Sequence, residues 1–207
     1  MKKLLHIIAT PRGEESRTLA VAGAFLEAFK KGHPDWAVEE LDLSKEDLPS
    51  LTVKRVDGKY VLLSGKDLSG DLKAAWEEIV KHIERFKSAD GYLISTPMWN
   101  FSIPYTLKHY IDVIIQPKYM FRYTATGAEG LVKDKKMAVI ASRGGDYSSK
   151  EARAADFQEP YLRAIFGLVG ITDVSFVVAQ PMDMGPDLQK QKIGEAQQAA
   201  RLAAGKF

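Results

Sequence analysis

The sequence predicts an α/β fold in which a five-stranded parallel sheet carries helices on both faces. Five apolar runs of strand length alternate with five segments of helical hydrophobic periodicity, a pattern typical of parallel strands joined by crossover helices. Three of the apolar runs lead directly into loops rich in polar residues, proline or glycine. The chain has 207 residues, of which 45% are hydrophobic, so it can fill one core, and we expect a single domain over residues 1–207.

The first half of the chain contains two predicted strands and two predicted helices. Residues 4–9 form a buried strand, and a polar loop then leads to a helix that begins near Ser16 and stops at Gly32. Residues 37–43 are more polar, which is typical of an edge strand. Residues 44–70 have an irregular pattern, and we expect a long excursion with apolar anchors. A helix over 71–87 has a clear apolar stripe.

The second half repeats the alternation of strands and helices. Residues 91–96 form the third strand, and Pro104 suits the first turn of a helix over 104–115. Residues 116–132 form a second irregular stretch, which is rich in aromatic residues. The remaining predicted elements are a strand over 136–141, a helix containing Phe157, Leu162 and Phe166, a strand over 173–179 and a terminal helix over 186–204.

The composition excludes several classes of protein. The 29 basic and 27 acidic residues leave a formal charge of +2, which provides no field for nucleic acid or an acidic membrane surface. There is no cysteine, so disulfides, thiolate metal sites and a cysteine nucleophile are excluded. No apolar run approaches the roughly 20 residues of a membrane span, and the N-terminal run lacks a cleavage site. We therefore expect a cytoplasmic protein.

Three loops follow the carboxyl ends of predicted strands. In the strand order 2-1-3-4-5 these loops border one crevice, where ligands of open α/β sheets bind. The first loop contains Thr10 and Ser16 and leads to helix amides at Arg17 and Thr18, which together make an anion site with the helix dipole behind it. The alternative is that Ser16 serves only as an N-cap.

The second and third loops suit a planar heteroaromatic ligand. Met98, Trp99 and Phe101 offer flat apolar surface, while the Asn100 amide can bind heteroatoms. The alternative is a hydrophobic turn in which Trp99 plugs the core and Asn100 caps the next helix. The third loop has the sequence Ser142-Arg143-Gly144-Gly145, whose glycines allow close backbone approach. Arg143 can balance anionic charge, although pairing at the surface is the commoner fate of an arginine.

Together, the three loops predict a site for a mononucleotide with a flat head, and flavin mononucleotide (FMN) matches this description. Competing motifs are absent, including G-x-x-x-x-G-K-[ST], G-x-G-x-x-G, G-x-S-x-G and H-E-x-x-H. The histidines at 6, 33, 82 and 109 are widely spread, and we expect them to be structural or solvated. No metal site is predicted, and no side chain is assigned as a general acid.

Five segments in this order resemble the FMN-dependent NADH:quinone oxidoreductases and NADH-azoreductases of bacteria. They are Met98-Trp99-Asn100-Phe101, Phe121-Arg122-Tyr123-Thr124, Gly130-Leu131-Val132, Ser142-Arg143-Gly144-Gly145 and Gly170-Ile171-Thr172-Asp173-Val174. The resemblance implies a flavodoxin-like three-layer α/β/α sandwich and a homodimer with FMN at the subunit interface. The FMN residues it implies are Thr10, Ser16, Arg17, Thr18, Met98, Trp99, Asn100, Phe101, Ser142, Arg143, Gly144 and Gly145.

The implied reaction is a ping-pong transfer of two electrons from NADH or NADPH, through FMN, to a quinone or azo compound. Phe121 and Tyr123 are candidates for a substrate pocket reaching the partner's site, and a hydrophobic dimer contact is compatible with that role. The family commonly has paired serines where Ala9-Thr10 stands here, and often tyrosine in place of Trp99. The alternative functions are a flavodoxin-type electron carrier and a flavin-free binding module. The physiological acceptor and the preference between NADH and NADPH stay open.

Overall fold

The computed structural model describes residues 1–207 and is built on a parallel sheet with the strand order β2-β1-β3-β6-β7. The strands are β1 (Lys2–Ile8), β2 (Trp36–Asp42), β3 (Gly91–Pro97), β6 (Lys136–Ser142) and β7 (Asp173–Ala179). Counted within the sheet alone, this is the order 2-1-3-4-5 that the sequence predicts. The carboxyl ends of β1, β3 and β6 therefore lie side by side, because these three strands are neighbours.

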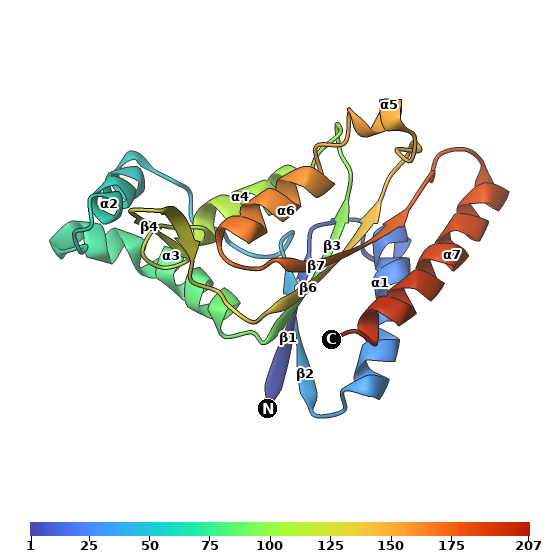
Figure 1. Cartoon of the computed structure of the whole chain (residues 1–207), viewed down its shortest axis with the longest axis horizontal. Helices are drawn as coiled ribbons and strands as arrows, with labels where there is room; N and C mark the ends of the chain where they lie inside the picture. The colour runs from blue at the N-terminus through green and yellow to red at the C-terminus, as the bar shows by residue number, and fades with distance from the viewer.

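Helices cover both faces of the sheet (Figure 1). On one face lie α1 (Arg17–Gly32) and α7 (Pro186–Ala204), and on the other lie α3 (Gly70–Lys87), α4 (Tyr105–Ile114) and α6 (Glu159–Leu168). Smaller elements are η1 (Gly13–Glu15), α2 (Val53–Leu63), α5 (Lys150–Arg153) and a hairpin of β4 (Phe121–Thr124) and β5 (Gly127–Gly130). None of the helices is both long and apolar enough to cross a membrane.

The two irregular stretches predicted from the sequence contain regular structure. Residues 44–70 include α2, and residues 116–132 include the β4–β5 hairpin. In α2, Gly58 resembles a helix breaker in the sequence, but a Cβ atom there would overlap the buried Trp76 of α3. The indole Nε1 of Trp76 donates to the carbonyl oxygen of Arg55 at 2.9 Å. Gly58 is therefore the point where two helices approach closely.

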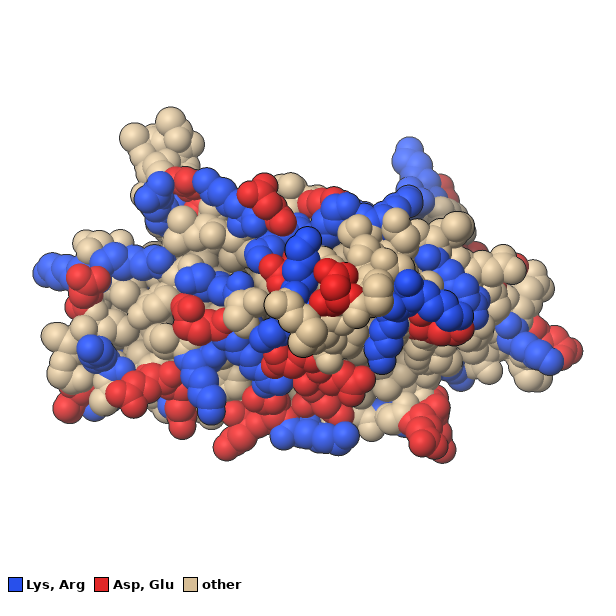
Figure 2. Space-filling model, turned by 90° about the horizontal axis from the view of Figure 1, so that it is seen from below, with Lys and Arg blue, Asp and Glu red and all other residues tan.

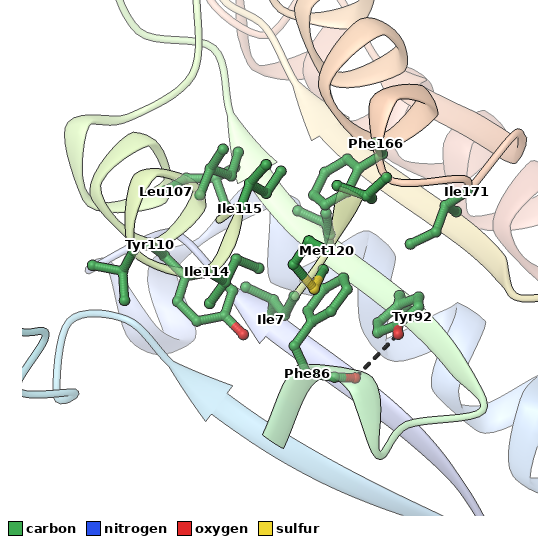
Figure 3. Close-up of a cluster of buried hydrophobic side chains, with 14 of the residues drawn as sticks. Ile7, Phe86, Tyr92, Leu107, Tyr110, Ile114, Ile115, Met120, Phe166 and Ile171 are labelled. Atoms are coloured by element: carbon green, nitrogen blue, oxygen red, sulfur yellow. Dashed lines mark hydrogen bonds between the residues drawn. The ribbon is translucent and has the colours of Figure 1, made fainter. Parts of the chain in front are cut away.

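The core is divided by the sheet into two clusters, because successive side chains of a strand point to opposite faces. The larger cluster contains Ile7, Tyr92 and Val139 with side chains of α3, α4 and α6. Figure 3 shows part of it, including the bond that the Tyr92 hydroxyl donates to the Phe86 carbonyl oxygen at 3.0 Å. The smaller cluster joins Leu4, Leu93 and Ile140 to α1 and α7. A sheet packed on both faces gives the loops at its edge a rigid base.

The three tryptophans lie in different surroundings. Trp36 packs edge-on against Phe29 of α1, with ring centroids 5.4 Å apart. Trp76 is 1% exposed between α2 and α3, whereas Trp99 is 39% exposed in the loop after β3. Trp99 is thus the tryptophan that lies at the carboxyl edge of the sheet.

Acidic and basic side chains are interspersed on the face where the sheet strands begin (Figure 2). This mixture agrees with the near balance of charges in the sequence. Charge on this face therefore indicates no binding surface, and we expect the function to lie in a local site.

Candidate functional site

A cavity of about 220 Å³ lies at the carboxyl edge of the sheet. It is lined by residues from the loops after β1, β3 and β6, as the strand order requires, and also by Met182 and Asp183 from the loop after β7. The residues predicted from the sequence that line it are Thr10, Ser16, Arg17, Thr18, Met98, Trp99, Ser142, Arg143 and Gly144. The three predicted loops thus meet in one cavity, and a fourth loop completes it.

The first turn of α1 forms the polar end of the cavity. Ser16 is the N-cap, and its Oγ accepts a hydrogen bond from the Leu19 amide at 3.3 Å. The earlier amides of the helix, at Arg17 and Thr18, have no intrahelical acceptor. The Thr18 and Ser142 hydroxyls lie 2.6 Å apart, which ties the base of α1 to the end of β6. Ser16 therefore acts as an N-cap and lines the cavity as well.

An ion pair spans the mouth of the cavity. Arg17 Nη1 lies 2.5 Å from Asp183 Oδ1, so the loop after β7 is joined to the start of α1. The Asp183 carboxylate also lies beside Gly144, where a Cβ atom would collide with it. A side chain at position 144 would therefore displace the Asp183 carboxylate, while the backbone amides of Met182 and Asp183 hold this fourth loop to the Gly144 carbonyl oxygen. The sequence analysis did not assign Asp183, although it follows the strand next to β6.

The loop after β3 is a tight turn between Trp99 and Ser102. The two residues exchange backbone hydrogen bonds of 2.9 Å in both directions. Between them, Asn100 and Phe101 have φ angles of 47° and 68°, the left-handed signs of a type I′ turn. This geometry is uncommon for phenylalanine. Asn100 and Phe101 are exposed beyond the cavity wall instead of filling the core.

Arg143 is buried, with 4% of its surface exposed. Its Nη1 lies 2.9 Å from Asp156 Oδ2, and its Nε donates to Gln158 Oε1 at 3.1 Å. The charge of Arg143 is therefore balanced by Asp156 within the protein. Its backbone amide donates to Ala179, which joins the glycine loop to β7.

Besides Asn100 and Phe101, two further groups of predicted site residues lie outside the cavity wall. Gly145 follows Gly144 and packs near the ring of Tyr147. Phe121 is 6% exposed within the larger core cluster, and the 68% exposed ring of Tyr123 meets it edge-on at 5.6 Å. Within one chain, this pair is on the β4–β5 hairpin beside α2 and α3, away from the loops at the sheet edge (Figure 1).

Phe157 is an exposed aromatic residue that the sequence analysis placed within a helix. In the structure it precedes α6, is 60% exposed, and its amide donates to the Phe101 carbonyl oxygen at 3.0 Å. The prediction was wrong for Phe157, because this residue lies at helical spacing from the apolar residues that follow it but precedes the helix. Phe157, Phe101 and Trp99 together give the edge of the sheet an exposed aromatic surface.

Comparison with known proteins identifies the family. A protein-family model described as a flavodoxin-like fold matches residues 2–203. The chain is 41% identical over 209 residues to an FMN-dependent NADH:quinone oxidoreductase of Nitratidesulfovibrio vulgaris (strain DP4), with all of both chains covered. The chain belongs to the FMN-dependent NADH:quinone oxidoreductase family. A relative from Pseudomonas fluorescens in this family is 36% identical, with 98% of this chain and 96% of the relative covered.

Solved structures agree with membership of the FMN-dependent NADH:quinone oxidoreductase family. An azoreductase from Bacillus anthracis is similar, with a TM-score of 0.90, 33% identity and full coverage of both chains. An FMN-dependent NADH-azoreductase from the same species, solved in complex with FMN, has a TM-score of 0.84 and 29% identity, with 99% and 100% of the two chains covered. The flavodoxin-like fold predicted from the sequence is thus confirmed.

One further polar group of this family member is buried in the sheet below the site. His6 in β1 is 2% exposed, and its Nε2 lies 2.8 Å from Ser95 Oγ of β3. Burial lowers the pKa of His6 to about 4, because the charged form is poorly solvated there. His6 is consequently neutral and structural at pH 7, as expected from the sequence.

Proposed function

We propose that this protein is an FMN-dependent oxidoreductase that transfers two electrons from NADH to quinones and azo compounds. The observation that carries the proposal is the meeting of four loops in one cavity at the carboxyl edge of the sheet. Its chain-wide similarity to FMN-dependent NADH:quinone oxidoreductases supports the same function. The residues involved come from both ends of the sequence, so the FMN-binding domain that we propose spans residues 1–207.

The polar end of the cavity fits a phosphate group. Hydroxyl groups of Thr10 and Ser16, the first-turn amides of α1 and the Arg17 guanidinium are the donors there. Amides at a helix N-terminus, with the dipole behind them, bind anions without a lysine. The Asp183 carboxylate pairs with the Arg17 guanidinium and so holds it at the mouth of the cavity.

The remaining residues fit a flavin ring. Met98, Trp99, Asn100 and Phe101 would hold one side of the ring, and Ser142, Arg143, Gly144 and Gly145 another. We assign Arg143 to positioning of this loop, because Asp156 balances its charge. Gly144 and Gly145 provide backbone amides without a side chain between them and a ligand.

Bound FMN would supply the redox chemistry, accepting a hydride from NADH and delivering two electrons to the acceptor in a ping-pong sequence. The protein would position the flavin ring and shield it from solvent. The Asn100 amide and the loop backbones would orient polar atoms of the ring, and Phe101 and Phe157, whose rings are exposed, would shield it from solvent. No side chain is assigned as a proton donor, and water can serve.

A homodimer is part of this proposal. Trp99, Phe101, Tyr105, Tyr123 and Phe157 are large exposed aromatic residues, and exposed aromatic side chains are enriched at protein interfaces. Tyr123, supported edge-on by Phe121, would then cover the substrate pocket of the other subunit. Sedimentation equilibrium that finds only monomers at micromolar concentrations would contradict the dimer. We place the reaction in the cytoplasm, where reduced nicotinamide nucleotides are formed.

The visible absorption spectrum of the purified protein tests the function. Flavin bands that bleach with NADH under anaerobic conditions, and return when benzoquinone is added, are the expected result. Steady NADH oxidation with quinone or an azo dye separates an enzyme from a flavodoxin-type electron carrier. A protein that stays colourless after incubation with FMN would be a flavin-free binding module and would contradict the proposal.

A further inference from the structure

The segment Pro97–Phe101, which leads from the end of β3 into the Trp99–Ser102 turn, is held at both ends by one short segment from a distant part of the chain. The Phe157 amide donates to the carbonyl oxygen of Phe101 at 3.0 Å. Next to it, Gln158 Nε2 donates to the carbonyl oxygen of Pro97 at 2.9 Å. These two contacts bracket the residues proposed to face the flavin, although the partners are about sixty positions apart in the sequence.

Gln158 is completely buried, and its polar groups all have partners. Its backbone amide donates to Asp156 Oδ1 at 2.9 Å, and its carbonyl oxygen accepts from Leu162 in α6 at 3.0 Å. Its side chain accepts from Arg143 and donates to Pro97. A buried polar side chain with this many partners has a single orientation, because any other would leave buried groups unpaired.

The same side chain joins the glycine loop to the turn. Arg143 Nε reaches Gln158 Oε1 at 3.1 Å, while Arg143 Nη1 reaches Asp156 Oδ2 at 2.9 Å. Asp156 Oδ1 accepts from the Gln158 and Glu159 amides at the start of α6. The start of α6 thereby fixes the loop after β3 relative to the loop after β6. The sheet alone joins these two loops only where each leaves its strand.

We propose that Gln158 is a positioning residue that sets the geometry of the Pro97–Phe101 turn relative to the Arg143–Gly144 loop. The assignment rests on the function proposed above, because these two loops are the ones assigned to the flavin ring. Asp156 supports Gln158 by holding Arg143 and capping α6. The side chains of Gln158, Asp156 and Arg143 are not required to touch the flavin for this role.

The backbone of the turn explains why such a brace is needed. Asn100 and Phe101 both have left-handed φ angles, which asparagine tolerates but which are unfavourable for phenylalanine. Strained backbone persists only where the surrounding structure fixes it. Loss of the bond to Pro97 would allow the turn to relax, and the groups assigned to the ring would lose their alignment.

The test is Gln158→Glu in the full-length protein loaded with FMN. The new carboxylate still accepts from Arg143 but cannot donate to the Pro97 carbonyl oxygen. We expect about tenfold weaker FMN binding, in line with the loss of one buried hydrogen bond, and an altered visible circular dichroism spectrum of the bound flavin. At acidic pH, protonation of the introduced carboxyl group restores an O–H donor, so the difference from wild type should shrink.

Gln116→Glu is the matched control. Gln116 is 1% exposed, and its Nε2 donates to the carbonyl oxygens of Asp112 and Val113 at the end of α4. It is outside the cavity wall. This variant should lose at least as much free energy of unfolding as Gln158→Glu, because the Gln116 side-chain oxygen is buried without a partner, while its FMN affinity and flavin dichroism stay at wild-type values.

The outcomes separate this assignment from the proposed function. Wild-type FMN affinity and wild-type flavin dichroism in Gln158→Glu would overturn the assignment alone. Failure of the wild-type protein to bind FMN would overturn the proposed function, and the assignment with it. If Gln158→Glu does not fold, Asp156→Asn replaces it, since an amide oxygen can still cap α6 but no longer balances Arg143. A smaller change of the flavin dichroism is expected there, and no change would overturn the assignment.

Discussion

At the scale of single residues, the left-handed backbone of Phe101 places strain where the ligand is expected. A two-residue turn with two left-handed φ angles usually contains glycine or asparagine. Only Asn100 meets this preference, and Phe101 does not. The turn gains from Phe101 an exposed ring beside Tyr147, with centroids 6.5 Å apart. Phe101 therefore contributes an exposed ring to the site, although its backbone conformation does not favour the turn.

Replacement of Asn100 by alanine and by glycine separates its side chain from its backbone. Both variants lose the amide, so both should bind FMN about tenfold more weakly if the amide contacts the ring. Only Asn100→Ala places a Cβ-bearing, non-asparagine residue in the left-handed region, and it should also lose about 1 kcal/mol of unfolding free energy.

FMN titrations and urea denaturation of both variants provide the measurement. Wild-type FMN affinity in Asn100→Gly would remove the amide from the site. In that case the asparagine would serve the turn alone.

Residue roles at the site were predictable where a loop follows its strand directly. Thr10, Met98 and Ser142 come immediately after apolar runs, so their place at the carboxyl edge follows from the strand order. Asp183 comes after a strand too, but its ion pair with Arg17 joins residues far apart in the sequence, which no local pattern specifies. The pairing of Arg143 with Asp156 depends on how α6 packs, which no local pattern specifies.

At the scale of helices and strands, periodicity located the five strands of the sheet and the helices that cover it. It failed for α2, because Gly58 and the surrounding charges hide the apolar side of a short helix. It failed differently at Phe157, which has helical spacing from the apolar residues of α6 but precedes the helix. In both cases the local structure involves a contact with a distant element, Gly58 with Trp76 and Phe157 with Phe101. Such contacts cannot be predicted from local sequence patterns.

Gly58→Ala tests the close approach of α2 and α3. In an exposed helix, glycine to alanine usually adds about 0.5–1 kcal/mol of stability. Here the new methyl group would collide with the indole of Trp76, which is fully buried and cannot withdraw. We expect a loss of about 1–3 kcal/mol, measured by urea denaturation.

Gly23→Ala is the control for this substitution. Gly23 lies in α1, and nothing is within 4 Å of a Cβ atom placed there. This variant should be more stable than wild type. Equal gains in both variants would mean that the two helices separate easily.

At the scale of the whole molecule, burial of His6 couples folding to pH. The pKa of His6 is about 4 in the folded protein and about 6.5 in an unfolded chain. Between these values the unfolded state binds more protons, so stability rises with pH. As the pH falls from about 7 to about 4, His6 should therefore remove roughly 3 kcal/mol of unfolding free energy.

His6→Gln isolates this contribution, because glutamine can still bond to Ser95 but does not titrate. Unfolding free energies of both proteins at pH 7 and pH 4.5 give the measurement. The variant should lose less stability than wild type over this interval. Parallel losses would show that carboxyl groups alone account for the acid sensitivity.

The different surroundings of the three tryptophans give the molecule an internal optical reporter. Indole fluorescence is emitted where oxidised flavin absorbs, so a tryptophan beside the ring transfers its excitation to the flavin. Trp99 lines the cavity, whereas Trp36 and Trp76 pack against α1 and between α2 and α3. Quenching of Trp99 fluorescence would report FMN binding in real time without an attached dye. In the double variant Trp36→Phe/Trp76→Phe, Trp99 would be the only tryptophan that fluoresces.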